Sequence, residues 1–314
     1  MKKTTALLCL ACICVLALAG CASLSPVEAR FSVVASSFPD YGFARAIAGD
    51  LAEVSMLLPP GQESHSFEPT PPDILKIQRC DVFIYGGGES DEWVRGILDS
   101  MDTSHMAIVT LMDCVEPLEE EDALEPEAFW EAEDELALPE YDEHVWTSPR
   151  NAALIARKIA DALCEADSFN AETYRSNLAG YLEQLDALDA RFREIAAQGR
   201  RKTIVFGDRF PFRYFAEAYG LKYYAAFRGC STETEPSPST VRILIERIKA
   251  EKIPVVFCIE LSDRRMAEMI GDNTGAKVLR LHSCHNVSKE DFNAGKTYLD
   301  FMNENTAALQ EALE

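Results

Sequence analysis

Basic residues are scarce in this sequence. Its 314 residues include 30 Lys and Arg against 52 Asp and Glu, which gives a formal net charge of −22 at pH 7. Such an excess of negative charge opposes contact with a phosphate backbone, so we expect no nucleic-acid partner. It attracts cations instead, although most of this charge is typical of a solvated surface. The length is sufficient for two domains with large cores.

Long apolar runs are also lacking, except for one near the N-terminus. That run, residues 6–19, follows two lysines and leads through Leu-Ala-Gly into Cys21. It is too short to span a bilayer comfortably, and small residues before a cysteine are typical of a lipoprotein signal. We predict a signal peptide over residues 1–20, a lipidated Cys21, a tether over residues 21–30, and an extracytoplasmic protein anchored to the cell membrane. An uncleaved membrane helix is the alternative.

Cysteine is sparse beyond this segment, where six residues remain. An even number outside the cytoplasm permits disulfides, although sequence alone does not give the pairing. Position is compatible with two pairs, Cys80 with Cys114 and Cys230 with Cys284. The other two, Cys164 in a helical pattern and Cys258 in a strand-like run, are predicted to be buried free thiols. Without a disulfide, the second pair would offer thiolates to a metal.

Common catalytic motifs are missing. The sequence has no His-Glu-x-x-His helix and no Gly-x-Ser-x-Gly turn, and the glycines at 86–88 lack the spacing and the lysine of a phosphate loop. We therefore predict no catalytic residue and a binding protein rather than an enzyme.

Strand-like runs alternate with helical patterns along the rest of the chain. The strand-like runs cover residues 31–35, 52–58, 82–85, 203–206, 223–226, 255–259 and 278–281. This rhythm predicts an α/β fold of two lobes, each with a small, mostly parallel sheet flanked by helices.

A long amphipathic helix is predicted between the two halves, because apolar residues from about 171 to 198 are spaced by three and four. At a rise of 1.5 Å per residue it would extend on the order of 40 Å. We therefore expect an N-terminal lobe over 31–169, a rigid spine helix over 170–199 and a C-terminal lobe over 200–314. A coiled-coil dimer is the alternative, but the repeat lasts only about four heptads, and we expect a monomer.

Histidine is rare as well, and its few positions are informative. Four of the five histidines lie in short polar segments where loops are expected, namely His65, His144, His282 and His285. Neutral imidazole is the commonest metal ligand among side chains, so this pattern favours a transition-metal site, with zinc as the leading candidate. Asp142 and Glu143 could accept the N–H of the neighbouring imidazole. The last two histidines follow a predicted strand, and strand ends in parallel sheets face ligand crevices.

Several segments together resemble a known family. They are the proline-rich His65 loop ending at residues 71–73, the turn at 86–93, His144-Val145-Trp146, the long helix and Tyr219-Gly220-Leu221. In combination they resemble the metal-specific substrate-binding lipoproteins of bacterial ABC importers, in the zinc and manganese branch. The resemblance covers nearly all of the chain after residue 30. It implies two lobes joined by one long helix, a metal buried between them, and delivery to a membrane permease and its ATPase.

The resemblance also implies ligands. His65 and His144 match the two histidines that the N-terminal lobes of this family use, and His282 stands where the family often has an aspartate after the last strand. The family's third ligand falls on Arg209, a cation that cannot bind a metal. Either His285 or Asp208, next to that arginine, would complete a tetrahedral site, and His285 is preferred.

These ligands favour Zn2+ over Mn2+, because manganese prefers more oxygen ligands and zinc accepts nitrogen-rich tetrahedral sites. Cu(II) would bind such ligands more tightly still, so affinity alone does not name the cargo. A manganese-binding protein, a surface adhesin and, least favoured, a zinc hydrolase are the alternatives.

Two acidic features remain. Residues 115–143 contain fourteen Asp and Glu and no Lys or Arg, a composition typical of a solvated disordered loop. Such a loop could also raise the local cation concentration, in which case deleting residues 119–135 would slow metal capture. Glu260 follows a predicted strand and is expected either near the metal or paired with Arg209, Arg228 or Arg264.

Overall fold

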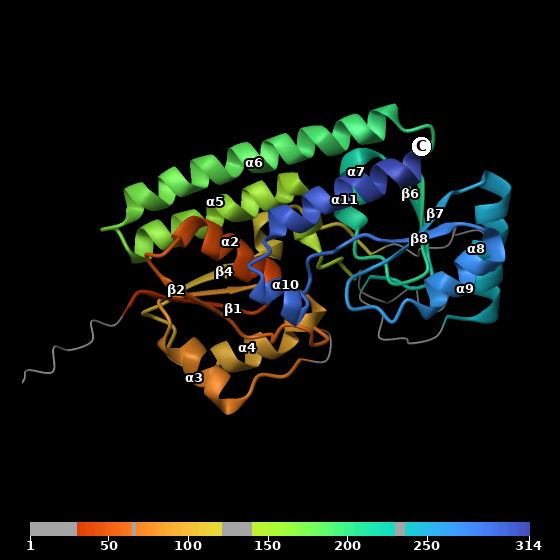
Figure 1. The fold of residues 1–314 in the computed structure, drawn as a ribbon. Helices are drawn as coiled ribbons and strands as arrows, with labels where there is room; N and C mark the ends of the chain where they lie inside the picture. The colour runs from red at the N-terminus through yellow and green to blue at the C-terminus, as the bar shows by residue number, and fades with distance from the viewer. Residues whose placement is uncertain (1–29, 65–66, 121–139, 230–235) are drawn as a thin grey trace, which may run out of the picture. The chain divides into compact units, whose positions relative to one another are not determined.

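The computed structural model describes residues 30–64, 67–120, 140–229 and 236–314 (Figure 1). The predicted signal peptide, the tether with Cys21, His65, Cys230 and most of the acidic stretch lie outside these residues.

Four short parallel strands form the first sheet. They are β1 (Ser32–Ala35), β2 (Glu53–Met56), β3 (Val82–Tyr85) and β4 (Ala107–Thr110), in the order β2-β1-β3-β4. One face packs against α3 (Pro71–Arg79) and α4 (Glu92–Leu98) through Val34 and Phe83, which cluster with residues of both helices. The other face packs against α2 (Phe38–Ala48) and α5 (Pro149–Ala166). Both faces are covered, as expected for a parallel sheet.

The second sheet repeats this arrangement. It contains β5 (Thr203–Phe206), β6 (Lys222–Ala225), β7 (Val255–Cys258) and β8 (Lys277–Arg280), all parallel, in the order β6-β5-β7-β8. Val205 and Val256 pack on α8 (Pro238–Glu251) and α9 (Arg265–Thr274). The predicted fold of two mostly parallel sheets flanked by helices is confirmed. In both sheets the strand order reverses beside the first strand, where ligands bind in open parallel sheets.

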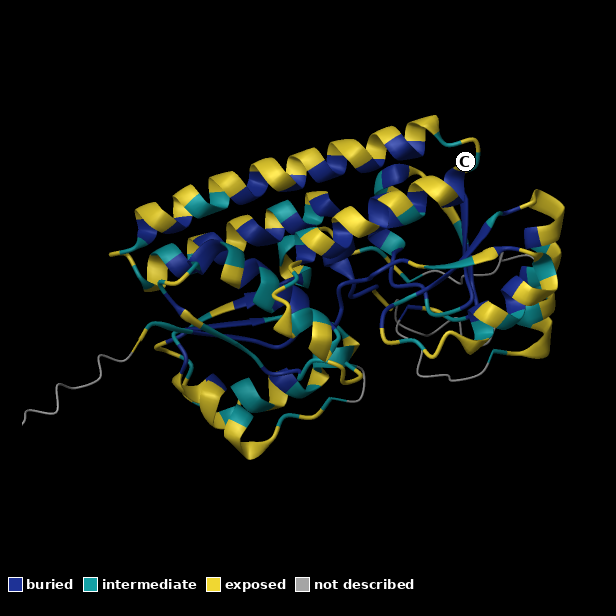
Figure 2. Cartoon of the chain, viewed as in Figure 1, coloured by how far each residue is buried: buried dark blue, intermediate teal, exposed yellow. Residues whose placement is uncertain are grey.

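The long helix α6 (Ala171–Gln198) matches the predicted range. It packs against α5, α2, α7 (Arg213–Tyr219) and α11 (Tyr298–Leu313). Figure 2 shows buried residues along the side of α6 that faces α5 and exposed residues along the opposite side. The buried side includes Tyr181, Leu185 and Phe192, which belong to the predicted apolar stripe.

The C-terminal segment forms two helices. Ser288 begins α10 (Lys289–Asn293), and its hydroxyl accepts the backbone N–H of Asp291 at 3.0 Å. The chain then turns at Gly295, which has a positive φ of 74°, before α11 begins. Because α11 packs on both α6 and α2, the end of the chain stabilises the spine helix and the first sheet's helices as well as the second sheet.

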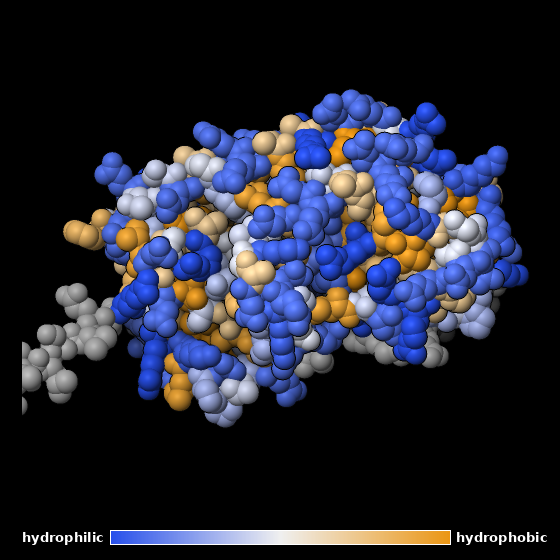
Figure 3. All heavy atoms as spheres, viewed as in Figure 1, coloured by the Kyte–Doolittle hydropathy of each residue, from blue (hydrophilic) through white to orange (hydrophobic). Residues whose placement is uncertain are grey.

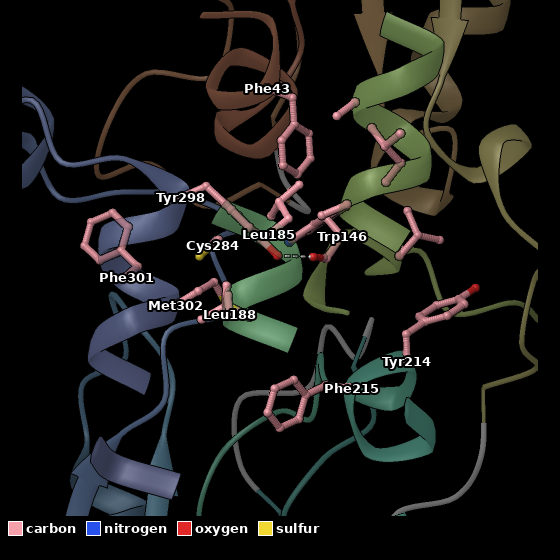
Figure 4. Close-up of a cluster of buried hydrophobic side chains, with 14 of the residues drawn as sticks. Phe43, Trp146, Leu185, Leu188, Tyr214, Phe215, Cys284, Tyr298, Phe301 and Met302 are labelled. Carbon is pink, nitrogen blue, oxygen red and sulfur yellow. Dashed lines mark hydrogen bonds between the residues drawn. The ribbon is translucent and has the colours of Figure 1, made fainter. Parts of the chain in front are cut away.

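A continuous hydrophobic cluster joins these parts (Figure 4). Phe43 of α2 and Phe301 of α11 lie in it together with Leu185 of α6. The Tyr298 hydroxyl donates a hydrogen bond to the backbone oxygen of Trp146 at 2.8 Å, drawn as a dashed line in Figure 4. The segment that follows His144 is therefore held by the core itself.

The predicted disulfide between Cys80 and Cys114 is wrong, because both are free thiols. Cys80 precedes β3 and Cys114 follows the parallel neighbour β4, so the two lie toward opposite ends of the sheet. Cys164 and Cys258 are free, as predicted, and Cys258 is buried, but Cys164 is only partly buried, so the expected burial is wrong for Cys164. Cys284 is also a free thiol and fully buried, which removes its expected bond to Cys230.

The face of the molecule shown in Figure 3 is mainly polar. In the face shown in Figure 3, hydrophilic residues predominate and hydrophobic side chains form separate patches between them. Among the described residues, no helix combines the length and apolar character needed to cross a membrane.

Candidate metal centre

His144 is held in one orientation by its neighbour Asp142. The Asp142 Oδ1 atom accepts the backbone N–H of His144 at 2.8 Å and lies 3.2 Å from the ring Nδ1. Both side chains are 1% exposed. Because a carboxylate only accepts hydrogen bonds, Nδ1 carries the proton and Nε2 keeps its lone pair for a metal. The prediction that a neighbouring carboxylate accepts this imidazole N–H is confirmed for Asp142.

Glu143 is anchored to the turn after β3. Ser90 donates its backbone N–H to Oε2 at 3.0 Å and its hydroxyl to Oε1 at 2.5 Å. Gly88 lies against the same side chain, and a Cβ there would come within 2.2 Å of the Glu143 Cβ. Only glycine fits at this position without displacing Glu143.

His285 lies in the loop between β8 and α10. Its ring Nδ1 is 3.4 Å from the Ser64 hydroxyl, and its backbone N–H donates to Glu260 Oε1 at 3.0 Å. Ser64 is the residue directly before His65 in the sequence, so the His65 loop reaches the His285 ring.

Glu143, His144 and His285 form a group that could hold a metal. Their ligand atoms all lie within 4.8 Å of one another. Within the part of the chain that the structure describes, these are the residues that bring at least three possible ligand atoms together. The two imidazole rings are nearly perpendicular, with centroids 5.1 Å apart, and the Trp146 ring packs edge-on against both. Two imidazoles and a carboxylate, all buried or nearly so, are a ligand set typical of Zn2+.

A cavity of about 90 Å³ opens beside this group. Its walls include His144, His285 and Glu260, together with Asp208 and Arg209 from the segment after β5. Since a single water needs about 10–15 Å³, the cavity has room for a metal ion and a few waters. Residues that follow strands of both sheets line it, as the strand order of the two sheets led us to expect.

His282 lies apart from the group. Its ring stacks on Phe301, with centroids 3.8 Å apart, and its Nδ1 accepts the backbone N–H of Cys284 at 3.0 Å. Asn305 binds both the backbone N–H and the backbone oxygen of His282 at 2.8 Å. Burial lowers the pKa of the imidazole, against an opposing effect of Glu260. In this neutral form the Nδ1 lone pair is already used within the loop.

Of the two remaining candidates, Asp208 and His65, only Asp208 lies among the described residues. The Asp208 carboxylate accepts the backbone N–H groups of Arg209 at 2.9 Å and of Ile259 at 3.2 Å, and burial raises its pKa. His65 lies outside the described residues. Arg209 lines the cavity and pairs with Glu63 at 3.6 Å.

Of the two positions expected for Glu260, it takes the one near the candidate metal group, and the alternative pairing with an arginine is wrong. Arg209, Arg228 and Arg264 pair with Glu63, Glu140 and Glu268 respectively. Glu260 accepts hydrogen bonds from the His285 loop instead. Glu143 was expected only to accept an imidazole N–H, and its possible role as a metal ligand was missed. Its position directly before His144 was the signal that could have indicated this role.

Fold and site together define a class of protein, the two-lobed α/β binding proteins that enclose a small ligand among residues at their strand ends. The family follows from comparison with known proteins. The model of the family described as "Zinc-uptake complex component A periplasmic" (ZnuA) matches residues 33–312, and the chain belongs to this family. This is a family of ABC-transporter substrate-binding proteins, not of enzymes, as predicted.

Two curated relatives show the extent of the similarity. The chain is 31% identical over 314 residues to the zinc-binding lipoprotein AdcA of Streptococcus pneumoniae, which is 100% of this chain and 62% of AdcA. It is 31% identical over 287 residues to the high-affinity zinc uptake system protein ZnuA of Bacillus subtilis, covering 90% of this chain and 88% of the relative. The chain therefore spans less than two thirds of the length of AdcA.

A solved structure has the same fold. The Zn(II)-bound ZnuA-like domain of Streptococcus pneumoniae AdcA superposes with a TM-score of 0.75 at 30% identity, covering 90% of this chain and 99% of that domain.

Proposed function

We propose that this protein captures Zn2+ outside the cytoplasm and delivers it to an ABC permease and its ATPase for import. The observation that carries the proposal is the group formed by Glu143, His144 and His285, which lies beside a cavity lined from both lobes. The relatives named for zinc binding and zinc uptake support the same metal.

In this proposal Zn2+ is the cargo and the ligands come from three segments. His144 offers Nε2, because Asp142 occupies its other nitrogen, and His285 and Glu143 offer the second nitrogen and an oxygen. His65 is the fourth ligand, supported by the contact of its neighbour Ser64 with the His285 ring. The nitrogen-rich set favours Zn2+ over Mn2+.

We assign His282 a structural role in place of the ligand role expected from the sequence. Its Nδ1 is engaged with the Cys284 backbone and its ring with Phe301, so it holds the loop that presents His285. Of the two candidates for completing the site, the geometry favours His285 over Asp208, because the ligand atom of His285 lies within 4.8 Å of those of His144 and Glu143, in a group that does not include Asp208.

Anchoring and delivery complete the proposal. Lipidation at Cys21 would tether the protein to the outer face of the cell membrane, close to a permease, and the naming of AdcA as a lipoprotein supports this. We propose that the protein acts as a monomer. Its N-terminal lobe comprises residues 31–169, its spine helix residues 170–199 and its C-terminal lobe residues 200–314.

The test is a titration with Co2+, followed by competition with Zn2+. The parent is expected to bind one Co2+ with the intense visible absorption of a tetrahedral site. His144→Ala and His285→Ala should each weaken binding at least a hundredfold. His105→Ala is the matched control, because His105 is exposed and its Nε2 contacts only the backbone oxygen of Gln78.

Two outcomes would overturn the assignment. If the parent binds no Co2+ or Zn2+, the proposed function is wrong. If the parent binds but both histidine variants bind like His105→Ala, the metal lies elsewhere.

A further inference from the structure

The loop over residues 281–288, called here the His285 loop, connects the parts of the site that lie far apart in the sequence. The indole N–H of Trp146 donates to the backbone oxygen of Ser283 at 2.9 Å, which ties the loop to the His144 segment. On the other side, the Gly61 N–H donates to the backbone oxygen of Val287 at 2.8 Å, and the Asn286 amide donates to the backbone oxygen of Gln62. The loop thus contacts both N-terminal segments that carry proposed ligands.

A single buried carboxylate holds this loop in place. Glu260, which is 7% exposed, lies two residues after β7. Its Oε2 accepts the backbone N–H of Ser283 at 2.7 Å, and its Oε1 accepts the Ser283 hydroxyl at 2.6 Å and the His285 N–H at 3.0 Å. The Asn286 N–H lies 3.5 Å from the same Oε1. The backbone N–H groups of three loop residues, Ser283, His285 and Asn286, therefore converge on one side chain.

The chemistry of these contacts requires a carboxylate. The loop groups that hydrogen-bond to Glu260 are all N–H or O–H donors, whereas the His282 Nδ1 lies farther away, 3.6 Å from Oε2. Only an ionised carboxylate offers acceptors on both oxygens. A glutamine of the same shape would turn an NH2 group toward backbone N–H donors. Hydrogen bonds of this charge-assisted kind are shorter and stronger than neutral ones, which agrees with the 2.6 Å and 2.7 Å distances to Ser283.

We propose that Glu260 is the positioning residue of the metal site, which holds the His285 backbone so that the imidazole meets His144. The inference rests on the proposed function. Glu260 itself lines the cavity, but its oxygens are directed to the loop, so it acts through His285 and does not bind the ion.

The experiment is a double-mutant cycle of Glu260→Gln and His285→Ala, with Zn2+ affinity measured by competition against a chelating dye. In the parent, Glu260→Gln should weaken binding at least tenfold. In the His285→Ala background the same substitution should change affinity less than threefold, because the ligand through which it acts is already gone. Glu268→Gln is the matched control, since that side chain is 56% exposed on α9 and pairs only with surface residues in the described part of the chain.

Two further measurements separate positioning from loss of the fold. Circular dichroism and thermal unfolding of the metal-free variants show whether Glu260→Gln folds, and Glu260→Asp, which keeps the charge on a shorter arm, should recover part of the affinity. If Glu260→Gln does not fold, Ser283→Ala in the same cycle tests the idea, because it removes one donor to Glu260 and leaves the carboxylate. X-ray absorption of zinc-loaded Glu260→Gln should show one imidazole fewer bound to zinc than in the parent.

The outcomes are distinct. A parent that binds no zinc refutes the proposed function. If the parent binds zinc, two results refute the positioning role alone. Glu260→Gln could weaken Zn2+ affinity equally with and without His285, or it could leave the number of imidazoles bound to zinc unchanged.

Discussion

Replacement of Asp142 tests how far a buried carboxylate prepares His144 for metal binding. Asp142→Ala removes the acceptor for both the backbone N–H of His144 and its ring Nδ1, which share the single oxygen Oδ1. The imidazole is then free to take the other tautomer or to rotate, and the protonated nitrogen could face the metal. Both side chains are 1% exposed, so water does not replace the lost acceptor.

The expected magnitude follows from similar partners of metal-bound imidazoles, whose removal weakens affinity about 10- to 100-fold, or about 1.4–2.7 kcal/mol. Asp142→Asn should have a smaller effect, below about tenfold, because the amide oxygen still accepts while the charge is lost. Zn2+ affinity is therefore expected to fall in the order parent, Asp142→Asn, Asp142→Ala. The first step measures the effect of the charge, and the second measures the effect of the hydrogen bonds.

The assay is competition for Zn2+ against a chelating dye at pH 7.5, with the thermal stability of each metal-free variant measured in parallel. Asp161→Asn, an exposed carboxylate on α5, is the matched control. The reasoning fails if Asp142→Ala binds Zn2+ as tightly as the control, or if Asp142→Asn weakens binding as much as Asp142→Ala.

Two further predictions concern the first sheet. Burial and the nearby charge of Asp91 raise the pKa of Asp40 from 3.8 to about 7. The folded protein therefore holds the Asp40 proton more tightly than the unfolded chain does. The resulting stabilisation is complete below the unfolded pKa of 3.8 and is lost as the pH rises through about 7. Asp40→Asn should therefore remove about 3 kcal/mol of the decline in unfolding free energy between pH 5 and pH 8, measured by urea denaturation, and an unchanged pH profile would contradict the assignment. Gly88→Ala should displace Glu143, because the new Cβ would lie 2.2 Å from that side chain, and should weaken Zn2+ binding about tenfold. Gly96→Ala is the control, because a Cβ there meets open space, and it should leave Zn2+ binding unchanged. Equal affinity of the two glycine variants would show that Glu143 does not take part.

Much of the fold was accessible from the sequence because its signals are local. The spacing of apolar residues predicted α6 with its bounds, since each turn of a helix needs only neighbours three and four positions away. The strand-like runs at 203–206 and 82–85 coincide with β5 and β3, because buried parallel strands are short, continuous and apolar. The helices α10 and α11 were not predicted, and the break between them depends on a glycine turn and on the packing of α11 against α6.

The class of fold and the family could be predicted from the sequence, and His144 could be proposed as a ligand, because a histidine placed before a proline-initiated helix is a local pattern. Tertiary structure alone decided which of His282 and His285 meets His144. The two are three residues apart in one loop, and only long-range packing separates them: Phe301 takes the first ring, and Glu260 holds the backbone of the second. The same holds for Cys80 and Cys114. Parallel strands were expected from the sequence, but only the tertiary structure shows that β3 and β4 are neighbours, which places the two thiols toward opposite ends of the sheet.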